Sequence, residues 1–363
     1  MKYPKFLQKG DTIGITAPSD GNRKEMDYQR LDLAVKKMEN LGYAIRETKN
    51  VRTSDGRGRS SEKTERAEQL MSLITDPGVS YIFSAKGGDF LMEILPLLDF
   101  QKIRENPTWF QGFSDNTGLT YTITTLCDTA SVYGNHFNDF SMQPWHDAVN
   151  YNYACMTGNP VIQKTFEGYE DDFYDRESPE EGYHIDKKSV CFARQNEQEL
   201  EKISINGRLL GGCVDVLLNL VGTRFDKTKE FVHKYKEDGI LWYLESFSLD
   251  SDSLTRGLWQ LKEAGWFDTA KGFVFGRPCM FESFTDHTYV EAVEVILSEL
   301  HVPIVFDADI GHKSPQFTIV NGALGTFDYH SGSLSFSMKF VFSSEQGDRW
   351  CMVVVSSCRE MLG

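Results

Sequence analysis

Four segments of the sequence run an apolar stretch directly into a polar or glycine-rich turn. They are Tyr81–Asp89, Trp109–Asp115, Ile240–Ser246 and Val302–His312, and their turns carry paired glycines, a serine, a glutamate and a histidine. The carboxyl ends of parallel strands face one crevice, so side chains that leave such strands converge although they lie far apart in sequence. A hydroxyl, a carboxylate and an imidazole beside the N–H groups of a glycine-rich turn are what hydrolysis through a serine nucleophile requires.

Ser114 is the candidate nucleophile because it lies at a predicted strand-to-helix turn. Gly112 removes side-chain bulk just before it, as in a nucleophile elbow, where the hydroxyl projects above the sheet. The segment departs from the strict Gly-x-Ser-x-Gly pattern, so Ser114 or Asp115 is alternatively a cap of the following helix. The N–H group of Asp115 would face the same point as the hydroxyl. The Gly87-Gly88 pair can also direct N–H groups toward an anion, although paired glycines often mark only a tight turn.

His312 is the candidate base, since it follows a predicted strand and an Asp-x-Asp-x-Gly turn. His136, within Gly-Asn-His-Phe, is the rival. Glu245 directly follows an apolar strand and would orient the imidazole. The alternatives for this carboxylate are a helix N-cap and a buried ion pair. The chain order of serine, acid and histidine matches the order in α/β-hydrolases.

Strand and helix patterns alternate through the N-terminal part of the chain. Strands are predicted over 12–17, 43–45, 79–84 and 109–113, with helices over 28–42, 61–76, 90–98 and 117–127. Strands separated by helices imply crossover connections and a mainly parallel sheet with helices on both faces.

The second half of the chain begins differently. The acidic stretch 167–182 is poor in aliphatic residues and contains a proline, so we predict a surface loop or lid within a linker over 156–200, with a solvated linker as the alternative. Strands at 240–244, 272–276 and 303–306 alternate again with helices. The alternating stretch 322–355 predicts an antiparallel β layer. We therefore expect domains over 1–155 and 201–363.

Charge and composition exclude several classes of function. The net charge of −15 and the isoelectric point near 5.0 oppose binding to nucleic acid or to anionic membranes. The N-terminus has no signal-peptide core and no apolar run reaches a membrane span, so we expect a cytoplasmic protein. The seven cysteines lack a Cys-x-x-Cys pair, which predicts reduced core thiols without zinc or disulfides.

A set of short motifs occurs in order from about residue 8 to about residue 330. The motifs are Lys9-Gly-Asp-Thr-Ile-Gly-Ile-Thr-Ala-Pro-Ser19, Gly87-Gly88, Leu95-Pro-Leu-Leu-Asp99, Asn106-Pro107, Gly112-Phe-Ser-Asp115, Gly211-Gly212, Gly222-Thr223, Leu244-Glu245, Gly276-Arg277 and Gly311-His312. As a set they resemble the LD-carboxypeptidase family of serine peptidases, which also includes the microcin C immunity proteins.

The resemblance implies a role for each candidate residue. Ser114 would be the nucleophile, Glu245 and His312 would complete a triad, and the backbone N–H groups of Gly88 and Asp115 would form the oxyanion hole. The fold implied is α/β, with a Rossmann-like, mainly parallel N-terminal domain and a smaller C-terminal α/β domain. The active site would lie between the domains of a homodimer subunit, without a metal or a cofactor.

The implied substrate is a small peptide, namely the L,D bond before a terminal D-alanine in a cytoplasmic muropeptide tetrapeptide. A carboxypeptidase must bind the terminal carboxylate, and Lys86 and Arg277 are the candidate cations; surface solvation or structural pairing is the alternative for both. Many peptidoglycan-acting members have an arginine before the Gly-Gly turn and His-Gly-Pro after the strand near 133. This chain has Lys86 and Tyr133-Gly-Asn-His136 at those places.

Three alternative functions stay open. A hydrolase of peptidyl- or aminoacyl-nucleotides would use a loop aromatic to stack on the base, and the candidates are Tyr169, Phe173, Tyr174 and Tyr183. A non-catalytic binding protein would keep the fold for sensing. A nucleotide-dependent oxidoreductase is disfavoured, because the first strand enters Ala17-Pro-Ser-Asp-Gly21 and not a Gly-x-Gly-x-x-Gly turn.

Overall fold

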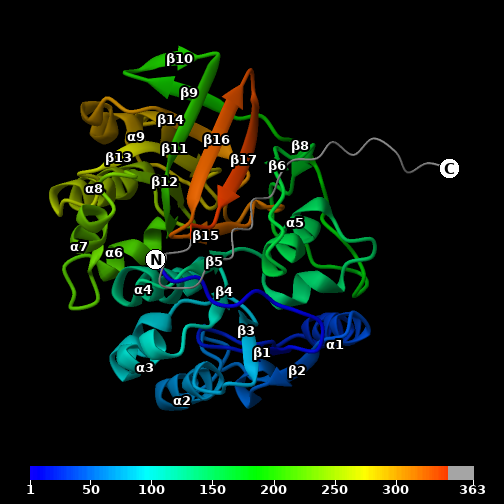
Figure 1. Cartoon of the computed structure of the whole chain (residues 1–363). Coiled ribbons are helices and arrows are strands. Elements are labelled where there is room, and N and C mark those ends of the chain that lie inside the picture. Colours follow the sequence, from blue (N-terminus) through cyan, green and yellow to red (C-terminus); the bar gives the residue numbers. More distant parts are fainter. Residues whose placement is uncertain (342–363) are drawn as a thin grey trace, which may run out of the picture.

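Two β-sheets organise residues 1–341, which are the residues that this computed structural model describes (Figure 1). The strands are β1 (Thr12–Thr16), β2 (Ala44–Glu47), β3 (Val79–Ser84), β4 (Trp109–Gln111), β5 (Ser131–Tyr133), β6 (Gln163–Lys164), β7 (Gly168–Tyr169), β8 (Lys187–Lys188), β9 (Phe192–Gln195), β10 (Gln198–Leu200), β11 (Lys202–Cys213), β12 (Ile240–Glu245), β13 (Ala270–Gly276), β14 (Ile304–Ala308), β15 (Ile319–Asn321), β16 (Leu324–His330) and β17 (Ser333–Lys339).

Helices connect and cover these strands. The α-helices are α1 (Glu25–Asn40), α2 (Lys63–Ile74), α3 (Phe100–Glu105), α4 (Thr117–Cys127), α5 (Asp147–Met156), α6 (Val214–Leu220), α7 (Thr228–Lys234), α8 (Ser251–Glu263) and α9 (Tyr289–Leu297). Short 3-10 helices are η1 (Lys49–Arg52), η2 (Leu91–Glu93), η3 (Leu95–Leu97), η4 (Ser114–Asn116), η5 (Phe137–Ser141) and η6 (Ser298–Leu300).

The first sheet has six strands in the order β15-β5-β4-β3-β1-β2. All neighbours are parallel except β15 and β5, which are antiparallel. The side chains of β1 and β3 are buried along almost their whole length, as expected when helices cover both faces of a parallel sheet. The predicted mainly parallel N-terminal sheet is confirmed.

The helix predicted over 90–98 is wrong. The chain forms two 3-10 turns there, η2 and η3, and Pro96 lies in the second turn. Proline has no N–H group and its ring clashes with the carbonyl four residues earlier, so a continuous α-helix cannot pass through this position without a break.

The second sheet has nine strands in the order β10-β9-β14-β13-β12-β11-β16-β17-β6. Strands β11 to β14 are parallel neighbours, whereas β11, β16 and β17 pair antiparallel. Strand β11 joins the two arrangements, because its first part pairs with β16 and its last part with β12. The predicted antiparallel layer is therefore continuous with the parallel strands, and its part over 342–355 lies outside the described residues.

The linker region contributes strands of its own. Strands β6 and β9 join the second sheet, and β7 and β8 pair with each other. The acidic stretch 167–182 contacts both halves of the molecule: Asp175 pairs with Lys24 at the start of α1 (2.6 Å), and Asp171 pairs with Lys313 (2.6 Å). The domain bounds 1–155, 156–200 and 201–363 stay a prediction.

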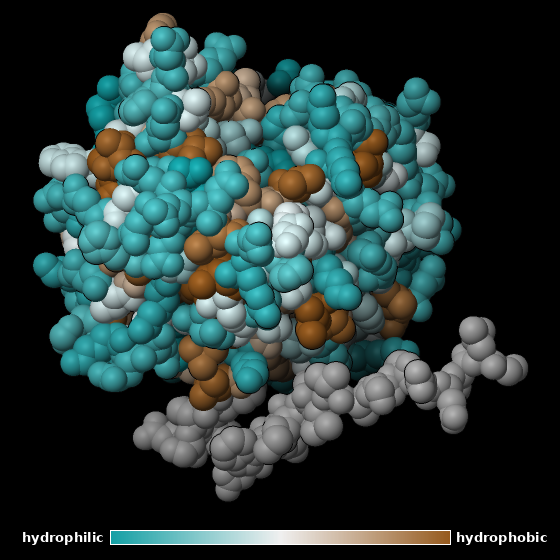
Figure 2. Space-filling view, turned by 90° about the horizontal axis from the view of Figure 1, so that it is seen from above, coloured by the Kyte–Doolittle hydropathy of each residue, from teal (hydrophilic) through white to brown (hydrophobic). Residues whose placement is uncertain are grey.

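The remaining features of the fold are the character of the surface, the state of the cysteines and the length of the apolar helices. On the face shown in Figure 2, hydrophilic residues surround separate hydrophobic patches. Cys127, Cys155, Cys191 and Cys213 are buried free thiols and Cys279 is partly exposed, while Cys351 and Cys358 lie outside the described residues. Within the described chain, no helix combines the length and the apolar character that crossing a membrane requires.

Candidate active site

Ser114 occupies a strained turn between β4 and α4. Its φ is 62°, in the left-handed region that costs a non-glycine residue about 1–2 kcal/mol. A Cβ at Gly112 would lie 2.8 Å from the Cβ of Asn116, so glycine is needed where the chain reverses. The amide of Asn116 donates to the carbonyls of Lys86 (2.9 Å) and Phe113 (3.2 Å) and ties the turn to the loop after β3. The conformation is that of a nucleophile elbow.

The paired glycines after β3 bring the backbone close to this serine. A Cβ at Gly87 would lie 3.0 Å from both the Cβ and the Oγ of Ser114. A Cβ at Gly88 would lie 2.4 Å from the Oγ of Ser19 and 2.8 Å from the carbonyl oxygen of Gly58. Both positions therefore need glycine for close approach.

The acid and the base leave neighbouring parts of the second sheet. Glu245 is the last residue of β12, and His312 follows β14 after a turn at Gly311. Gly311 has a φ of 93°, and a Cβ there would lie 2.6–2.7 Å from the side chain of Glu245. The glycine thus permits the turn that carries His312 to pass directly over the carboxylate.

The three side chains form a continuous hydrogen-bonded series. The Nε2 atom of His312 lies 2.9 Å from the Oγ of Ser114, and its Nδ1 atom lies 2.9 Å from the Oε2 of Glu245. The side chain of Glu245 is 0% exposed and that of His312 is 7% exposed. An imidazole placed between a hydroxyl and a buried carboxylate can accept the hydroxyl proton and be stabilised while it carries it.

Tyr133 completes the surroundings of the acid. Its hydroxyl donates to the Oε1 of Glu245 (2.7 Å), so the two carboxylate oxygens have different partners. Burial raises the pKa of Tyr133 well above its usual value, and the neighbouring charge of Glu245 raises it further, which keeps the phenol a donor. Tyr133 lies in β5 of the first sheet, so this bond also joins the two sheets.

Further contacts hold the sheets together beside the site. The backbone N–H of Cys213, in β11, donates to the hydroxyl of Thr117 at the start of α4 (3.1 Å). The hydroxyl of Tyr243, in β12, donates to the side-chain oxygen of Asn321 in β15 (2.8 Å). These buried bonds fix the end of β12 relative to the elbow, which is why groups from two sheets meet.

His136, the rival base, lies in the same cavity but is paired differently. Its Nε2 atom is 3.4 Å from the amide nitrogen of Asn116, and its ring stacks on Phe113 with centroids 4.3 Å apart. Burial, and then the charge of His312, lowers the pKa of His136 to about 3. The imidazole is therefore neutral at neutral pH, and its ring helps to hold the elbow.

The carboxylate of Asp115 is buried and forms hydrogen bonds within the protein. Its carboxylate accepts hydrogen bonds from the hydroxyl of Ser19 and from the N–H of Leu91 (2.8 Å), and burial raises its pKa. These bonds anchor the residue that follows the serine. The assignment of the Asp115 and Gly88 N–H groups as an oxyanion hole stays a prediction.

A cavity of about 320 Å³ opens over the serine. Ser114, His312, His136 and both paired glycines line it, together with two cations, Arg23 and Lys86, and two acids, Asp20 and Asp89. Among residues 1–341, no group of three or more His, Cys, Asp or Glu side chains is arranged to hold a metal ion.

The two cations predicted to bind substrate have different positions. Lys86 lines the cavity, and its ammonium pairs with Asp27 (3.1 Å). Arg277 is 5% exposed, pairs with the buried Asp309 (2.8 Å), and stacks over the ring of Tyr169 at 4.2 Å. It is not among the residues that line the described cavity, because Asp309 holds it inside the turn before His312.

Sequence reasoning missed two residues of the site. Tyr133 was seen only as part of the stretch before His136, and its contact with Glu245 depends on two sheets that no local pattern brings together. Arg23 lies between β1 and α1, where the sequence pattern indicates only that a dinucleotide-binding turn is missing. The signal for Arg23 is a cation that follows the first strand at the carboxyl edge of a parallel sheet.

Sequence profiles of one family match two parts of the chain. The profile of the LD-carboxypeptidase N-terminal domain matches residues 13–134, and that of the LD-carboxypeptidase C-terminal domain matches residues 206–327. Together these matches cover more than half of the 363 residues.

Individual relatives are distant but extend over most of the chain. The "Probable murein peptide carboxypeptidase" of Bacillus subtilis is 25% identical over 327 residues, which are 88% of this chain and 89% of that protein. The microcin C7 self-immunity protein MccF of Escherichia coli is 22% identical over 355 residues, 92% of this chain and 95% of that protein.

Solved structures share the same architecture. MccF in complex with aspartyl sulfamoyl adenosine has a TM-score of 0.76 at 21% identity, covering 93% of this chain and 99% of that chain. The muramoyltetrapeptide carboxypeptidase from Oxalobacter formigenes has a TM-score of 0.66 at 20% identity, covering 90% and 98%. At these identities the likeness establishes the α/β fold alone.

Proposed function

The chain belongs to the LD-carboxypeptidase family, and we propose that it is a serine carboxypeptidase that hydrolyses the L,D amide bond before a terminal D-alanine in muropeptide tetrapeptides. The observation that carries this proposal is the series from Ser114 through His312 to Glu245, with 2.9 Å at each step. The substrate class follows the family and its murein-acting members, not the geometry.

In the proposed mechanism, His312 takes the proton of Ser114 as the hydroxyl oxygen attacks the scissile carbonyl. Glu245 accepts a hydrogen bond from Nδ1 of His312, which leaves the unprotonated Nε2 facing the serine. The carboxylate also stabilises the imidazolium that forms. His312 then gives the proton to the leaving amine of D-alanine. Water, activated by the same imidazole, hydrolyses the acyl-enzyme and restores the serine.

The negative charge on the tetrahedral intermediate needs donors at the elbow. We propose the backbone N–H groups of Gly88 and Asp115, because Gly88 lines the same cavity as the hydroxyl, and Asp115 directly follows the serine and is anchored by the hydroxyl of Ser19. One such donor contributes about 3 kcal/mol of transition-state stabilisation. Of the two cations predicted to bind substrate, Lys86 and Arg277, Lys86 lines the same cavity.

Incubation with muropeptide tri-, tetra- and pentapeptides, followed by mass spectrometry, tests the proposal. We expect D-alanine release from the tetrapeptide alone, and no release by Ser114→Ala. Inertness of the wild-type protein toward all three peptides would reject this substrate class.

A second function has its own structural support. The acidic stretch places Phe173, 61% exposed, with its ring 6.2 Å from that of Phe247, which in turn lies 4.5 Å from the His312 ring. An exposed aromatic ring close to His312 is suited to stacking on a nucleobase of a bound ligand. Hydrolysis of peptidyl- or aminoacyl-nucleotides, the ligand type seen with MccF, is therefore the alternative. Cleavage of an aspartyl-sulfamoyl nucleotide, measured beside D-alanine release, separates the two substrates.

A non-catalytic binding role predicts a different result. Such a protein would bind a ligand without turnover, and Ser114→Ala would leave its affinity unchanged. We further propose a cytoplasmic homodimer. Light scattering of the purified full chain checks the subunit number, and cell fractionation checks the location.

A further inference from the structure

The two cations of the cavity differ in how their charges are used. Lys86 already has a carboxylate partner, since Asp27 lies 3.1 Å from its ammonium. Burial alone would raise the pKa of Asp27, but Lys86 and the N–H groups of Lys24 and Arg23 lower it overall, so the partner stays ionised. Arg23, on the same cavity wall, forms no ion pair with any of residues 1–341. Its guanidinium donors are available to a ligand.

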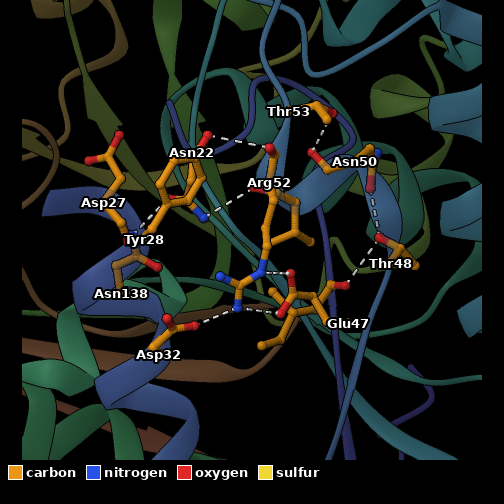
Figure 3. Close-up of polar contacts among 12 residues, drawn as sticks. Asn22, Asp27, Tyr28, Asp32, Glu47, Thr48, Asn50, Arg52, Thr53 and Asn138 are labelled. Carbon is orange, nitrogen blue, oxygen red and sulfur yellow. Dashed lines mark hydrogen bonds and ion pairs between the residues drawn. The ribbon is translucent and has the colours of Figure 1, made fainter. Parts of the chain in front are cut away.

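The backbone that carries Arg23 is fixed on both sides, and Figure 3 labels two of the residues that fix it, Asn22 and Asp27. Before it, the buried Asn22 donates from its N–H to the carbonyl of Val51 (2.8 Å) and accepts from the amide of Asn138 (2.8 Å). After it, the carboxylate of Asp27 accepts from the N–H of Arg23 (3.1 Å). An exposed arginine on an anchored backbone loses less entropy when it binds a ligand.

The guanidinium has a defined place over a glycine turn. A Cβ at Gly56 would lie 2.9 Å from the NH1 atom and 3.1 Å from the Cζ atom of Arg23, and Gly56 has a φ of 73°. The lack of a side chain at Gly56 therefore admits the guanidinium. Arg52, shown in Figure 3, contrasts with Arg23, because Glu47 and Asp32 each accept a hydrogen bond from the Arg52 guanidinium at 2.6 Å.

We propose that Arg23 binds the terminal carboxylate of the peptide substrate and thereby restricts the enzyme to the last residue of a peptide. This inference rests on the proposed carboxypeptidase function. A guanidinium offers two parallel N–H donors that match a carboxylate, whereas an ammonium is a point charge, here shared with Asp27. Arg277 is paired with Asp309, and its role in substrate binding stays a prediction.

The cavity also contains two acidic side chains, which affect how it can bind an anion. Asp20 and Asp89 line the same cavity as Arg23 and Lys86, so two acids balance the two cations and the cavity does not attract anions by net charge. Neither acid forms an ion pair with Arg23 among the described residues. Recognition of a carboxylate therefore depends on the directed donors of Arg23, and a neutral amide at the same place would leave the guanidinium unmatched.

Calorimetry on Ser114→Ala, which binds without turnover, measures this directly. The probes are the muropeptide tetrapeptide with a free terminal carboxylate and the same peptide as its C-terminal amide. We expect the free acid to bind more tightly, and Arg23→Gln to weaken it about 10- to 100-fold with little effect on the amide. Arg23→Lys should restore part of the preference.

Arg57 supplies the matched control. It is exposed in the adjacent turn and does not line the cavity, so Arg57→Gln removes the same charge from the same neighbourhood. This variant should keep the full preference for the free acid. Thermal melting of each variant checks that the fold is retained.

The possible outcomes separate this inference from the function on which it rests. If the wild-type protein releases D-alanine and Arg23→Gln keeps the preference for the free acid, the role of Arg23 is rejected and the carboxypeptidase function stands. Equal binding of acid and amide by the starting protein rejects it as well. If neither peptide binds and no D-alanine is released, the proposed function fails before any variant is compared.

Discussion

The proposed nucleophile and the proposed acid–base pair are positioned by different physical means. On the nucleophile side the backbone decides: Ser114 sits at a φ of 62°, and Gly87 and Gly88 allow the next loop to approach its hydroxyl. On the acid–base side buried side-chain bonds decide, since Tyr133 and His312 each hold one oxygen of Glu245. The first side stores conformational strain, and the second buries a charge.

Substitutions on the two sides should therefore have different effects on activity and on stability. A change on the nucleophile side alters the direction of one hydroxyl and leaves no charge unpaired. A change on the acid–base side disturbs a carboxylate that is 0% exposed and depends on its partners. Activity and stability should therefore separate on the first side and fall together on the second.

The largest effect should come from Ser114. Ser114→Ala removes the attacking oxygen, so kcat should fall about 10⁴- to 10⁶-fold while the melting temperature changes little. Ser114→Gly removes the oxygen and also the strain, and should be more stable than Ser114→Ala by about 1 kcal/mol. Chemical denaturation of the two variants measures this gap. Equal stability would show that the turn is not strained.

Glu245→Gln should give the next largest effect. The amide nitrogen of glutamine would face a donor, either the Tyr133 hydroxyl or His312, so the imidazole loses its orientation. We expect kcat to fall about 10³- to 10⁴-fold, with lower stability as well. Single-turnover kinetics at saturating peptide give the comparison. A loss below tenfold would mean that the carboxylate is structural.

The turn before His312 should tolerate no side chain. Gly311→Ala would place a Cβ 2.6 Å from Glu245 at a φ of 93°. We expect the free energy of unfolding to fall by about 2–3 kcal/mol and activity to be lost. Gly10→Ala is the matched control, because Gly10 has a φ of 91° with nothing within 4 Å. Gly10→Ala should lower the free energy of unfolding only by the backbone strain, about 1 kcal/mol.

The smallest effect concerns acid pH. His136 has a pKa of about 3 in the folded protein against 6.5 in an unfolded chain, so the unfolded state binds more protons between these values. Stability should therefore decrease as the pH falls from 6.5 toward 3. Because His136 lines a cavity and is partly exposed, we expect on the order of 1–2 kcal/mol. His136→Gln, followed by denaturation at several pH values, should flatten this dependence. An unchanged slope would assign it to other groups.

The sequence best predicts the candidate site where a reactive side chain directly follows a predicted strand. Ser114, Glu245 and His312 each come after an apolar stretch, and the carboxyl ends of parallel strands bring such positions together. Arg277 shows where this reasoning stops. It also leaves a strand, but whether a cation faces a cavity or a buried acid depends on the neighbouring turn with Asp309, which no periodicity reports.

Two further differences have physical causes of the same kind. The 90–98 segment looks helical by its spacing, yet Pro96 divides it into two turns. Strand β15 is three residues long, and its partner β5 lies far away in sequence. So short a strand takes its place from the surrounding core and not from its own pattern, which is why its membership in the first sheet was not predicted.

The position of β15 determines when this protein can be completed during synthesis. Ile319 in β15 pairs with Tyr133 in β5, and the Tyr133 hydroxyl donates to Glu245. Because β15 follows His312 in the sequence, β5 has no partner on its outer side in the growing chain until His312 has been made. The half that contains the serine thus gains this edge strand only after β14 and the histidine have been made. We therefore expect the hydroxyl and its proton acceptor to be brought together late in synthesis.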